Sequence, residues 1–386
     1  MSDLATAALE SHALGCLDCG KCTASCPIPL AGADYSPRRH VVSAVQGDRE
    51  DTVGNASIFQ CLTCSQCDQR CPAGVDYTGL IMKLRSLAFK DGTVPECPHG
   101  GAMQSVMRMM AGGGTQQDRL GWVTDDLKTQ PETGEVFFWT GCTMYYDAFF
   151  PEFGVNTQAG SQASVKLLNS IGVDPVVSPQ ERCCGHDLLW NGDVKNFEAL
   201  AKFNVDLVEK SGAKILVTPC AECVRTWRID YAKYRTDDLR VLHMTEYLAE
   251  NAGKLKFKKP ENGEAENGAR KVTFQDPCRL GRHLGVYDAP RELMAKVPGV
   301  ELEEMAHSGK SATCCAGGTW SSCDRFSKQI QVGRLREARD TGADLMVTAC
   351  PKCQVHFKCS MKDPKLGSDI EIEMRDLTEI LADALE

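Results

Sequence analysis

The chain has 386 residues, a net charge of −9 and 25% charged residues, a composition typical of a globular protein with two or three domains. The negative charge gives no reason to expect nucleic acid or an anionic membrane surface as a partner. The first fifteen residues lack the basic start and apolar core of a signal peptide, and the apolar runs are too short to cross a bilayer. We therefore expect a cytoplasmic protein with no direct membrane insertion.

Cysteine is strongly over-represented, with 21 residues. An odd number of cysteines in a chain without an export signal argues against a framework of disulfides. Clustered cysteines in such a protein more often bind metal or take part in redox chemistry.

The first cysteines form two groups with the same spacing, "CLDCGKCTASCP" from residue 16 and "CLTCSQCDQRCP" from residue 61. Two residues separate each of the first three cysteines, and three precede the fourth, which proline follows. This run is typical of cubane [4Fe–4S] clusters, in which the fourth cysteine ligates the other cluster. The predicted ligand sets are Cys16, Cys19, Cys22 and Cys71 for one cubane, and Cys61, Cys64, Cys67 and Cys26 for the other.

Zinc is the alternative for these groups, although zinc sites usually have two cysteine pairs with a longer spacer. Helices are expected around the groups. Ser36 and Pro37 form a helix start and Gly47 a stop, and apolar residues at helical spacing end at Gly92. Residues 1–94 are thus predicted to be an α-helical ferredoxin module.

Residues 95–134 are predicted to be a linker, rich in glycine and polar residues. Methionines and a valine in it share one helical face: Met103, Val106, Met107 and Met110. This stripe either docks a partner or packs against its own protein, and packing is the more common role.

From residue 135 strands and helices alternate, and the series then repeats. Strands are expected at 134–142, 214–220, 270–278 and 344–353, and helices at 161–173, 196–213 and 325–343. A charged spacer at 254–270 separates the halves. The pattern predicts two duplicated α/β domains, 135–260 and 261–386, with mainly parallel strands, within an α+β multidomain chain.

Each repeat carries one cysteine after a strand, an adjacent pair and a C-x-x-C. The first set is Cys142, Cys183, Cys184, Cys220 and Cys223, and the second, 130 to 136 residues later, is Cys278, Cys314, Cys315, Cys350 and Cys353. Ends of parallel strands commonly build sites, so five thiolates can converge in each repeat. Five are too many for one zinc or one cubane and suit an irregular iron–sulfur cluster. A redox-active dithiol or a zinc site with spare cysteines is the alternative.

This constellation resembles the heterodisulfide reductase family. The repeats are similar to the cysteine-rich CCG domains of its B-type subunit, residues 1–90 are similar to its C-type subunit, and the fusion is similar to its catalytic D-type subunit. The stretches that carry the resemblance are "CLDCGKCTASCP…YSPRRHV", "CLTCSQCDQRCPAGVDY", "TGCTMYYD", "CCG", "TPCAEC", "DPCRLGRHLGVYDAPREL", "CCAGG" and "ACPKC".

The resemblance implies a noncubane [4Fe–4S] cluster held by the five cysteines of each repeat, with a disulfide substrate between the two clusters. Ala316 departs from the pattern, because glycine usually follows the cysteine pair. Three cysteines are left over and are expected to be ordinary thiols: Cys97, Cys323 and Cys359.

Cleavage of a disulfide consumes two electrons and two protons, and His186 and His283 are candidate proton donors. Each could instead change the reduction potential of a cluster by hydrogen bonding to it. Arg279 and Arg282 could bind an anionic group, although a solvated helix face is the simpler expectation. No glycine-rich phosphate loop follows a strand, so no flavin or nicotinamide site is expected.

The predicted function is that of an iron–sulfur redox subunit of heterodisulfide reductase type. Its expected partners are a flavoprotein, hydrogenase-like or membrane electron-transfer subunit and a small disulfide. The alternative is an electron-transfer subunit without disulfide chemistry, as in benzoyl-CoA reductase-type or sulfate-reducer complexes.

Overall fold

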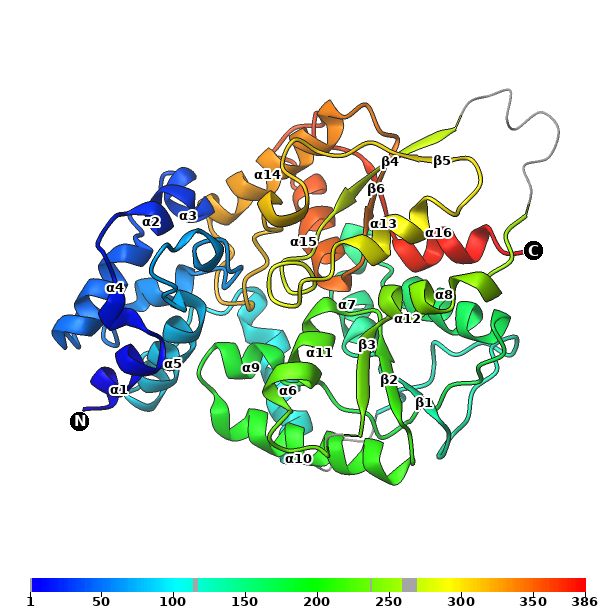
Figure 1. Cartoon of the computed structure of the whole chain (residues 1–386), viewed down its shortest axis with the longest axis horizontal. Coiled ribbons are helices and arrows are strands. Elements are labelled where there is room, and N and C mark those ends of the chain that lie inside the picture. Colours follow the sequence, from blue (N-terminus) through cyan, green and yellow to red (C-terminus); the bar gives the residue numbers. More distant parts are fainter. Residues whose placement is uncertain (1, 114–116, 237, 259–268) are drawn as a thin grey trace. The chain divides into compact units, whose positions relative to one another are not determined.

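The computed structural model describes residues 2–113, 117–236, 238–258 and 269–386 (Figure 1). The chain forms two compact units, each built from separate stretches of sequence. The first unit comprises Met1–Gly113, Gly185–Leu200 and Thr313–Gln331. The second comprises Gly114–Cys184, Ala201–Ala312 and Val332–Glu386.

These units cut across the four sequence segments, so the predicted domain boundaries at 94, 134 and 260 stay predictions. Two parts of the predicted connections, 114–116 of the linker and 259–268 of the spacer, lie outside the described residues.

The first unit is helical. Its helices are α1 Asp3–Glu10, α2 Lys21–Ser25, α3 Pro27–Leu30, α4 Pro37–Gln46, α5 Tyr77–Lys90, α6 Ala102–Gly112 and α9 His186–Trp190. Short 3₁₀ turns lie at Ala13–Gly15, Ala56–Gln60, Asp68–Arg70 and His99–Gly101. Helices α1, α4 and α5 pack on one another through residues such as Leu4, Val41 and Leu84, all buried. The predicted start and stop of α4 are confirmed, since Ser36 caps its first turn and Gly47 ends it in a left-handed conformation.

Arg85 of α5 explains why stretches from both repeats join the first unit. Its fully buried guanidinium donates to the carbonyls of Ile58 and Cys61, at 2.7–3.0 Å, and to that of Trp190, at 3.0 Å. It also donates to Thr319 Oγ1 at 3.3 Å. One charged side chain therefore ties the second cysteine loop to the segments that follow the cysteine pairs.

The methionine stripe of α6 is buried rather than presented to a partner. Met103, Met107 and Met110 are each at most 2% exposed, and Gln104 beside them donates to the carbonyl of Trp320 at 2.7 Å. This face of the helix therefore packs against its own protein, the more common of the two predicted roles.

The second unit contains two parallel sheets. The first has the order β1-β2-β3, with bounds Val136–Phe138, Ile215–Thr218 and Arg240–His243. The second has the order β5-β4-β6-β7, with bounds Val300–Leu302, Arg270–Gln275, Leu345–Thr348 and Glu373–Asp376. Val176 bridges to β1 on the side away from β2, as β5 flanks β4, so both sheets follow one plan.

Helices connect and cover the strands of this unit. They are α7 Thr143–Phe149, α8 Gln158–Ser170, α11 Ala221–Arg225, α12 Met244–Glu250, α13 Asp288–Met294, α15 Pro351–Met361 and α16 Leu377–Asp383. Two longer helices, α10 Val194–Lys210 and α14 Arg325–Asp340, cross from one unit to the other along the chain. Shorter turns are Pro151–Phe153, Thr226–Asp230, Ala252–Lys254 and Gly309–Ser311.

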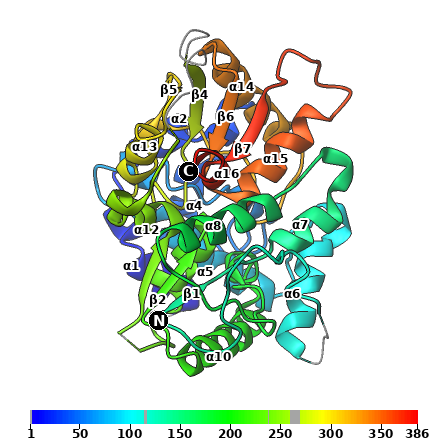
Figure 2. The ribbon, with the colours of Figure 1, turned by 90° about the vertical axis from the view of Figure 1, so that its right-hand side faces the viewer.

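The two repeats pack reciprocally. Helix α8 of the first repeat lies against α16 of the second, and α12 of the first lies against α13 of the second (Figure 2). Thr378 Oγ1 donates to the carbonyl of Gly160 at 3.0 Å, where a side chain in place of glycine would meet Asp376. Since equivalent helices exchange partners, the repeats share one core around an approximate two-fold arrangement.

All four predicted strands are longer than the observed ones, and the one predicted at 344–353 shows the reason. Strand β6 ends at Thr348, and α15 begins at Pro351, whose fixed φ suits the first helical position. In the described part of the chain, no helix combines the length and apolarity needed to cross a bilayer.

Candidate iron–sulfur sites

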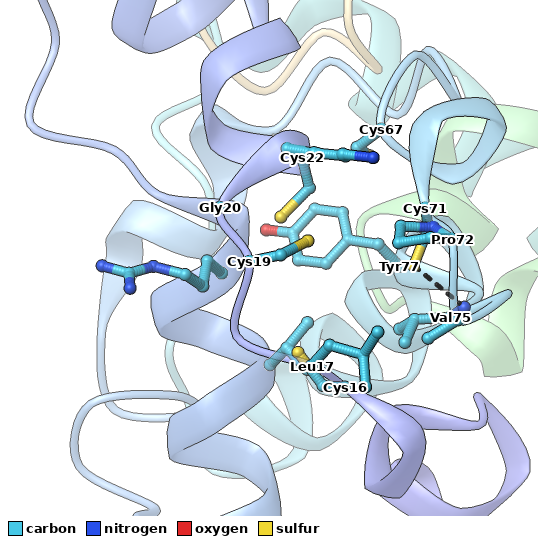
Figure 3. A pocket seen from close by; sticks show the side chains of 14 residues that line it. Cys16, Leu17, Cys19, Gly20, Cys22, Cys67, Cys71, Pro72, Val75 and Tyr77 are labelled. Atoms are coloured by element: carbon cyan, nitrogen blue, oxygen red, sulfur yellow. Dashed lines mark hydrogen bonds between the residues drawn. The ribbon is translucent and has the colours of Figure 1, made fainter.

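The first predicted ligand set surrounds a pocket of about 430 Å³ in the first unit. Its lining includes Cys16, Cys19, Cys22 and Cys71, whose side chains are arranged around that of Tyr77 (Figure 3). Cys19 is exposed and the other three are half-buried. Cys71, the fourth cysteine of the second run, therefore lies at the same pocket as the first group, and Cys67 of the second predicted set lines this pocket as well. The exchange of fourth ligands stays a prediction.

The second ligand set lies deeper. Cys61, Cys64 and Cys67 are buried, and Cys26 stands close enough for their charges to act on it. Burial raises the pKa of Cys26 first, and the charges of Cys64 and Cys61 raise it further. Unpaired thiolates would be unfavourable in this setting, so the four sulfurs fit a cationic iron core.

Both cysteine loops use the same strained backbone. Asp18 and Thr63, two residues after the first cysteine of each run, have φ of 52° and 51°. Gly20 and Ser65, two residues further on, have φ of 75° and 58°. Left-handed non-glycine residues, above all the β-branched Thr63, cost conformational energy and concentrate at functional sites.

Backbone N–H groups point at the cysteine sulfurs. The amides of Asp18 and Thr63 donate to Cys16 Sγ and Cys61 Sγ at 3.4 and 3.3 Å, and Val75 N donates to Cys71 Sγ at 3.3 Å (Figure 3). These bonds favour thiolates over thiols and suit the sulfur ligands of a cluster.

A buried polar chain lies next to both predicted ligand sets. Tyr77, which lines the first pocket, bonds through its hydroxyl to Tyr35 at 2.5 Å and to His40 Nδ1 at 2.9 Å. Burial raises the pKa of Tyr77, and the charges of Cys61, Cys67 and Cys26 raise it further. Tyr77 therefore faces both sets, a position that the sequence did not single out.

Five cysteines converge in the first repeat. Cys223 Sγ lies 3.5 Å from Cys184 Sγ, and Cys223 N donates to Cys220 Sγ at 3.4 Å. A hydrogen bond to Cys183 is the largest cause of the raised pKa of Cys142, with burial next. All five are buried. They come from the ends of β1 and β2 and from the loop before α9, so the topology of the sheet assembles them.

A buried ion pair supports the loop of Cys142. Glu181 accepts from the amides of Thr140 and Gly141 at 3.0 and 2.7 Å, and Arg119 donates to both Glu181 and the Gly141 carbonyl at 2.7–2.8 Å. Arg119 belongs to the predicted linker, which sequence reasoning did not connect with the site. In the sequence, Arg119 follows a glycine-rich stretch, and this position does not indicate a contact with Glu181.

The second set of five is divided between the units. Cys278, Cys350 and Cys353 belong to the second unit, and Cys314 and Cys315 to the first, so convergence of this set stays a prediction. The turn after the second pair has the expected form. Ala316 has φ of 51°, close to the 72° of the equivalent Gly185, so alanine adopts the glycine conformation at some cost in strain.

The candidate histidines have polar partners. His186 is buried, and its Nδ1 lies 3.1 Å from Asp187 Oδ1. His283 Nε2 accepts from Arg279 at 2.7 Å. Arg279 is 3% exposed, so it does not lie on a solvated helix face, while Arg282 donates to the carbonyl of Ala312 at 2.6 Å.

The three left-over cysteines differ in exposure. Cys97 and Cys359 are half-buried and Cys323 is exposed. Burial raises the pKa of Cys97, as expected for an ordinary thiol. The role predicted for these residues stays a prediction.

Comparison with known proteins matches this arrangement. The cysteine-rich domain family matches residues 136–227 and 272–358, and the 4Fe-4S dicluster domain family matches residues 12–75. The D-type subunit of dihydromethanophenazine:CoB–CoM heterodisulfide reductase from Methanosarcina barkeri is 31% identical over 409 residues, covering 96% of this chain and 93% of that protein. The chain belongs to the family of D-type heterodisulfide reductase subunits.

Other relatives of this heterodisulfide reductase-like chain carry different names. The B-type subunit of fumarate reductase (CoM/CoB) from Methanothermobacter marburgensis is 28% identical, covering 95% of this chain and 71% of its own length. The probable iron–sulfur-binding oxidoreductase FadF from Bacillus subtilis is 25% identical, covering 96% and 59%. A crystal structure of a hypothetical protein from Helicobacter pylori matches with a TM-score of 0.55 at 10% identity, covering 90% and 66%, which shows a shared fold.

These matches and the cysteine geometry establish the coarse function. The chain is an iron–sulfur redox subunit of oxidoreductase type, with a helical ferredoxin module and two parallel-sheet CCG domains. The relatives are named as subunits, which indicates that this chain also has partners.

Proposed function

We propose that this chain is the disulfide-converting subunit of a heterodisulfide reductase-type complex, with two cubane and two noncubane [4Fe–4S] clusters. When bound, such clusters supply one-electron carriers between a donor and a disulfide. The single observation that carries the proposal is the convergence of Cys142, Cys183, Cys184, Cys220 and Cys223 in one buried site. Five thiol ligands exceed the needs of one zinc or one cubane.

The difference in burial between the two ligand sets suggests where electrons enter the protein. Cys19 is exposed, whereas Cys61, Cys64 and Cys67 are buried. A redox partner therefore meets the first ligand set at the surface, and the second set is shielded from it. The donor is a flavoprotein, hydrogenase-like or membrane subunit, which fits the naming of the relatives as subunits.

Reduction of a disulfide breaks one S–S bond, takes two electrons from the reduced donor and takes two protons to give two thiols. His186 and His283 are the proposed proton donors. Because Arg279 donates to His283 Nε2, the neutral ring carries its proton on Nδ1. His283 would therefore act as a proton donor only as the imidazolium, which forms when Nε2 is released from Arg279 and takes up a proton.

The test uses anaerobically purified protein in its complex. We expect about sixteen irons with matching sulfide, EPR signals of two cluster types, and oxidation of reduced viologen that depends on an added low-molecular-weight disulfide. The C223S variant should lose the turnover and one noncubane signal, while C97S should behave as the parent protein. If the protein with all its clusters loaded reduces none of the added disulfides, the catalytic part of the proposal is overturned.

A second candidate is electron transfer alone, without disulfide chemistry. The similarity to a fumarate reductase subunit and to FadF favours it, since these names refer to other oxidoreductases. In that case the loaded protein would exchange electrons with a partner flavoprotein but leave every disulfide intact.

A further inference from the structure

A buried ion pair joins the two C-x-x-C loops of the second unit. Lys352 Nζ lies 3.2 Å from each carboxylate oxygen of Glu222. The side chains are 2% and 10% exposed, so water screens the pair weakly. Both residues lie between the two cysteines of their motif, in Cys220–Cys223 and in Cys350–Cys353.

The two partners occupy equivalent positions of the repeats. Strands β2 and β6 are 130 residues apart, and the same offset relates Glu222 to Lys352. The duplicated fold thus places an acid in one repeat and a base in the other at one point of its approximate two-fold arrangement. The two C-x-x-C motifs therefore share one backbone arrangement but differ in charge, because the first carries an acid where the second carries a base.

Stability alone is a weak reason for this pair. Removing two charges from water costs about as much as their attraction returns, and well-packed apolar residues often serve a core as well. The position beside cysteines on both sides suggests an electrostatic role. Clusters held by thiolates are anionic, and a nearby fixed cation stabilises the reduced form more than the oxidised form.

Resting on the proposed clusters, we propose that Lys352 is a positioning residue that carries a fixed positive charge from the second repeat to the iron–sulfur site of the first, where Glu222 holds it. The long lysine side chain spans from α15 to the carboxylate at the start of α11. A hydrogen bond with Cys223 is the largest cause of the lowered pKa of Cys220, and the positive charge of Lys352 lowers that pKa further. The first site is therefore not complete within its own repeat.

The experiment is a redox titration of the purified complex, followed by EPR, with the C223S variant identifying the signal of the first repeat. We expect K352M to move the midpoint potential of that signal to a more negative value. E222Q should move it the opposite way, because it removes the negative partner and leaves an acceptor for the lysine. K352R should lie near the parent value.

Lys362→Met is the matched control, since Lys362 is exposed at the end of the same helix. Loaded variants with unchanged potentials would overturn the proposal. So would loss of the cluster in both K352R and E222Q, because that result would assign the pair to assembly. Absence of any noncubane signal in the parent protein would instead contradict the proposed function itself.

Discussion

His243 and Asp376 occupy equivalent ends of β3 and β7, and each caps the helix that follows in the same way. His243 Nδ1 accepts from Thr245 N at 3.2 Å, and Asp376 Oδ1 accepts from Thr378 N at 2.9 Å. In return Glu246 and Glu379 accept from the two capping amides at 2.9 Å. One reciprocal capping box is thus built with different side chains.

These caps should respond to pH in opposite directions. Burial lowers the pKa of His243 from 6.5 to about 4, so the stability contributed by its neutral ring falls as pH drops below about 6.5. Burial raises the pKa of Asp376 from 3.8 to about 7, so its contribution is full below pH 4 and is lost as pH rises through 7. Each shift corresponds to about 3–4 kcal/mol.

The measurement is the apparent Tm from pH 4.5 to 8 for H243N and D376N. The first variant should flatten the acid side of the profile and the second the neutral side. A uniform shift of Tm at every pH in both variants would contradict this assignment.

The exchange of fourth ligands can be tested with single cysteine variants. C71S should alter the EPR signal of the exposed cluster, and C26S that of the buried one, because each removes one of four ligands. Access of a soluble chelator to the altered cluster should be faster in C71S, where Cys19 is exposed. C97S is the control and should keep both signals. If C71S and C26S affect the opposite clusters, the ligand sets are wrong.

Gly141 should be intolerant of alanine for two separable reasons. Its φ is 75°, and an added Cβ would lie 3.1 Å from Cys223 Sγ. Gly172 has φ of 84° but nothing within 4 Å of that position, so G172A measures backbone strain alone, about 1–2 kcal/mol. We expect G141A to lose the first-repeat noncubane signal and G172A only to lower Tm. Equal iron content in both variants would show that the contact is harmless.

Arg85→Met should destabilise the first unit and weaken binding of the second cubane. The change leaves the carbonyls of Ile58, Cys61 and Trp190 without this buried donor, at about 1–3 kcal/mol each. Lys90→Met on the exposed end of α5 is the control. Calorimetry and iron counting give the readout, and a Tm within the range of the control would remove Arg85 as the tie.

Much of this architecture is visible in the sequence because its signals are local. Ser36, Pro37 and Gly47 mark both ends of α4, and fixed cysteine spacings mark the cluster loops. Strand β6 was predicted too long because the apolar run continues into Ala349, and only Pro351 marks the start of the helix.

The supporting contacts could not be predicted, since they join distant residues. Arg119 reaches Glu181 from a stretch that looks like a linker, and Arg85 reaches Trp190 across 105 residues. Glu222 and Lys352 are an intermediate case. Superposing the two repeats places opposite charges at one position, which is a detectable signal, but only the folded sheets show that these side chains meet.

The uneven burial of the cysteines has a consequence for damage by air. Oxygen or peroxide diffusing from solvent reaches Cys19, the exposed member of the first ligand set, before it reaches the buried thiols of the second set or the first repeat. Inactivation should therefore proceed from the outside inward, disconnecting the protein from its donor while its interior remains whole. Brief aeration would then be reversible by a thiol reductant together with iron and sulfide, supplied at the outer position alone.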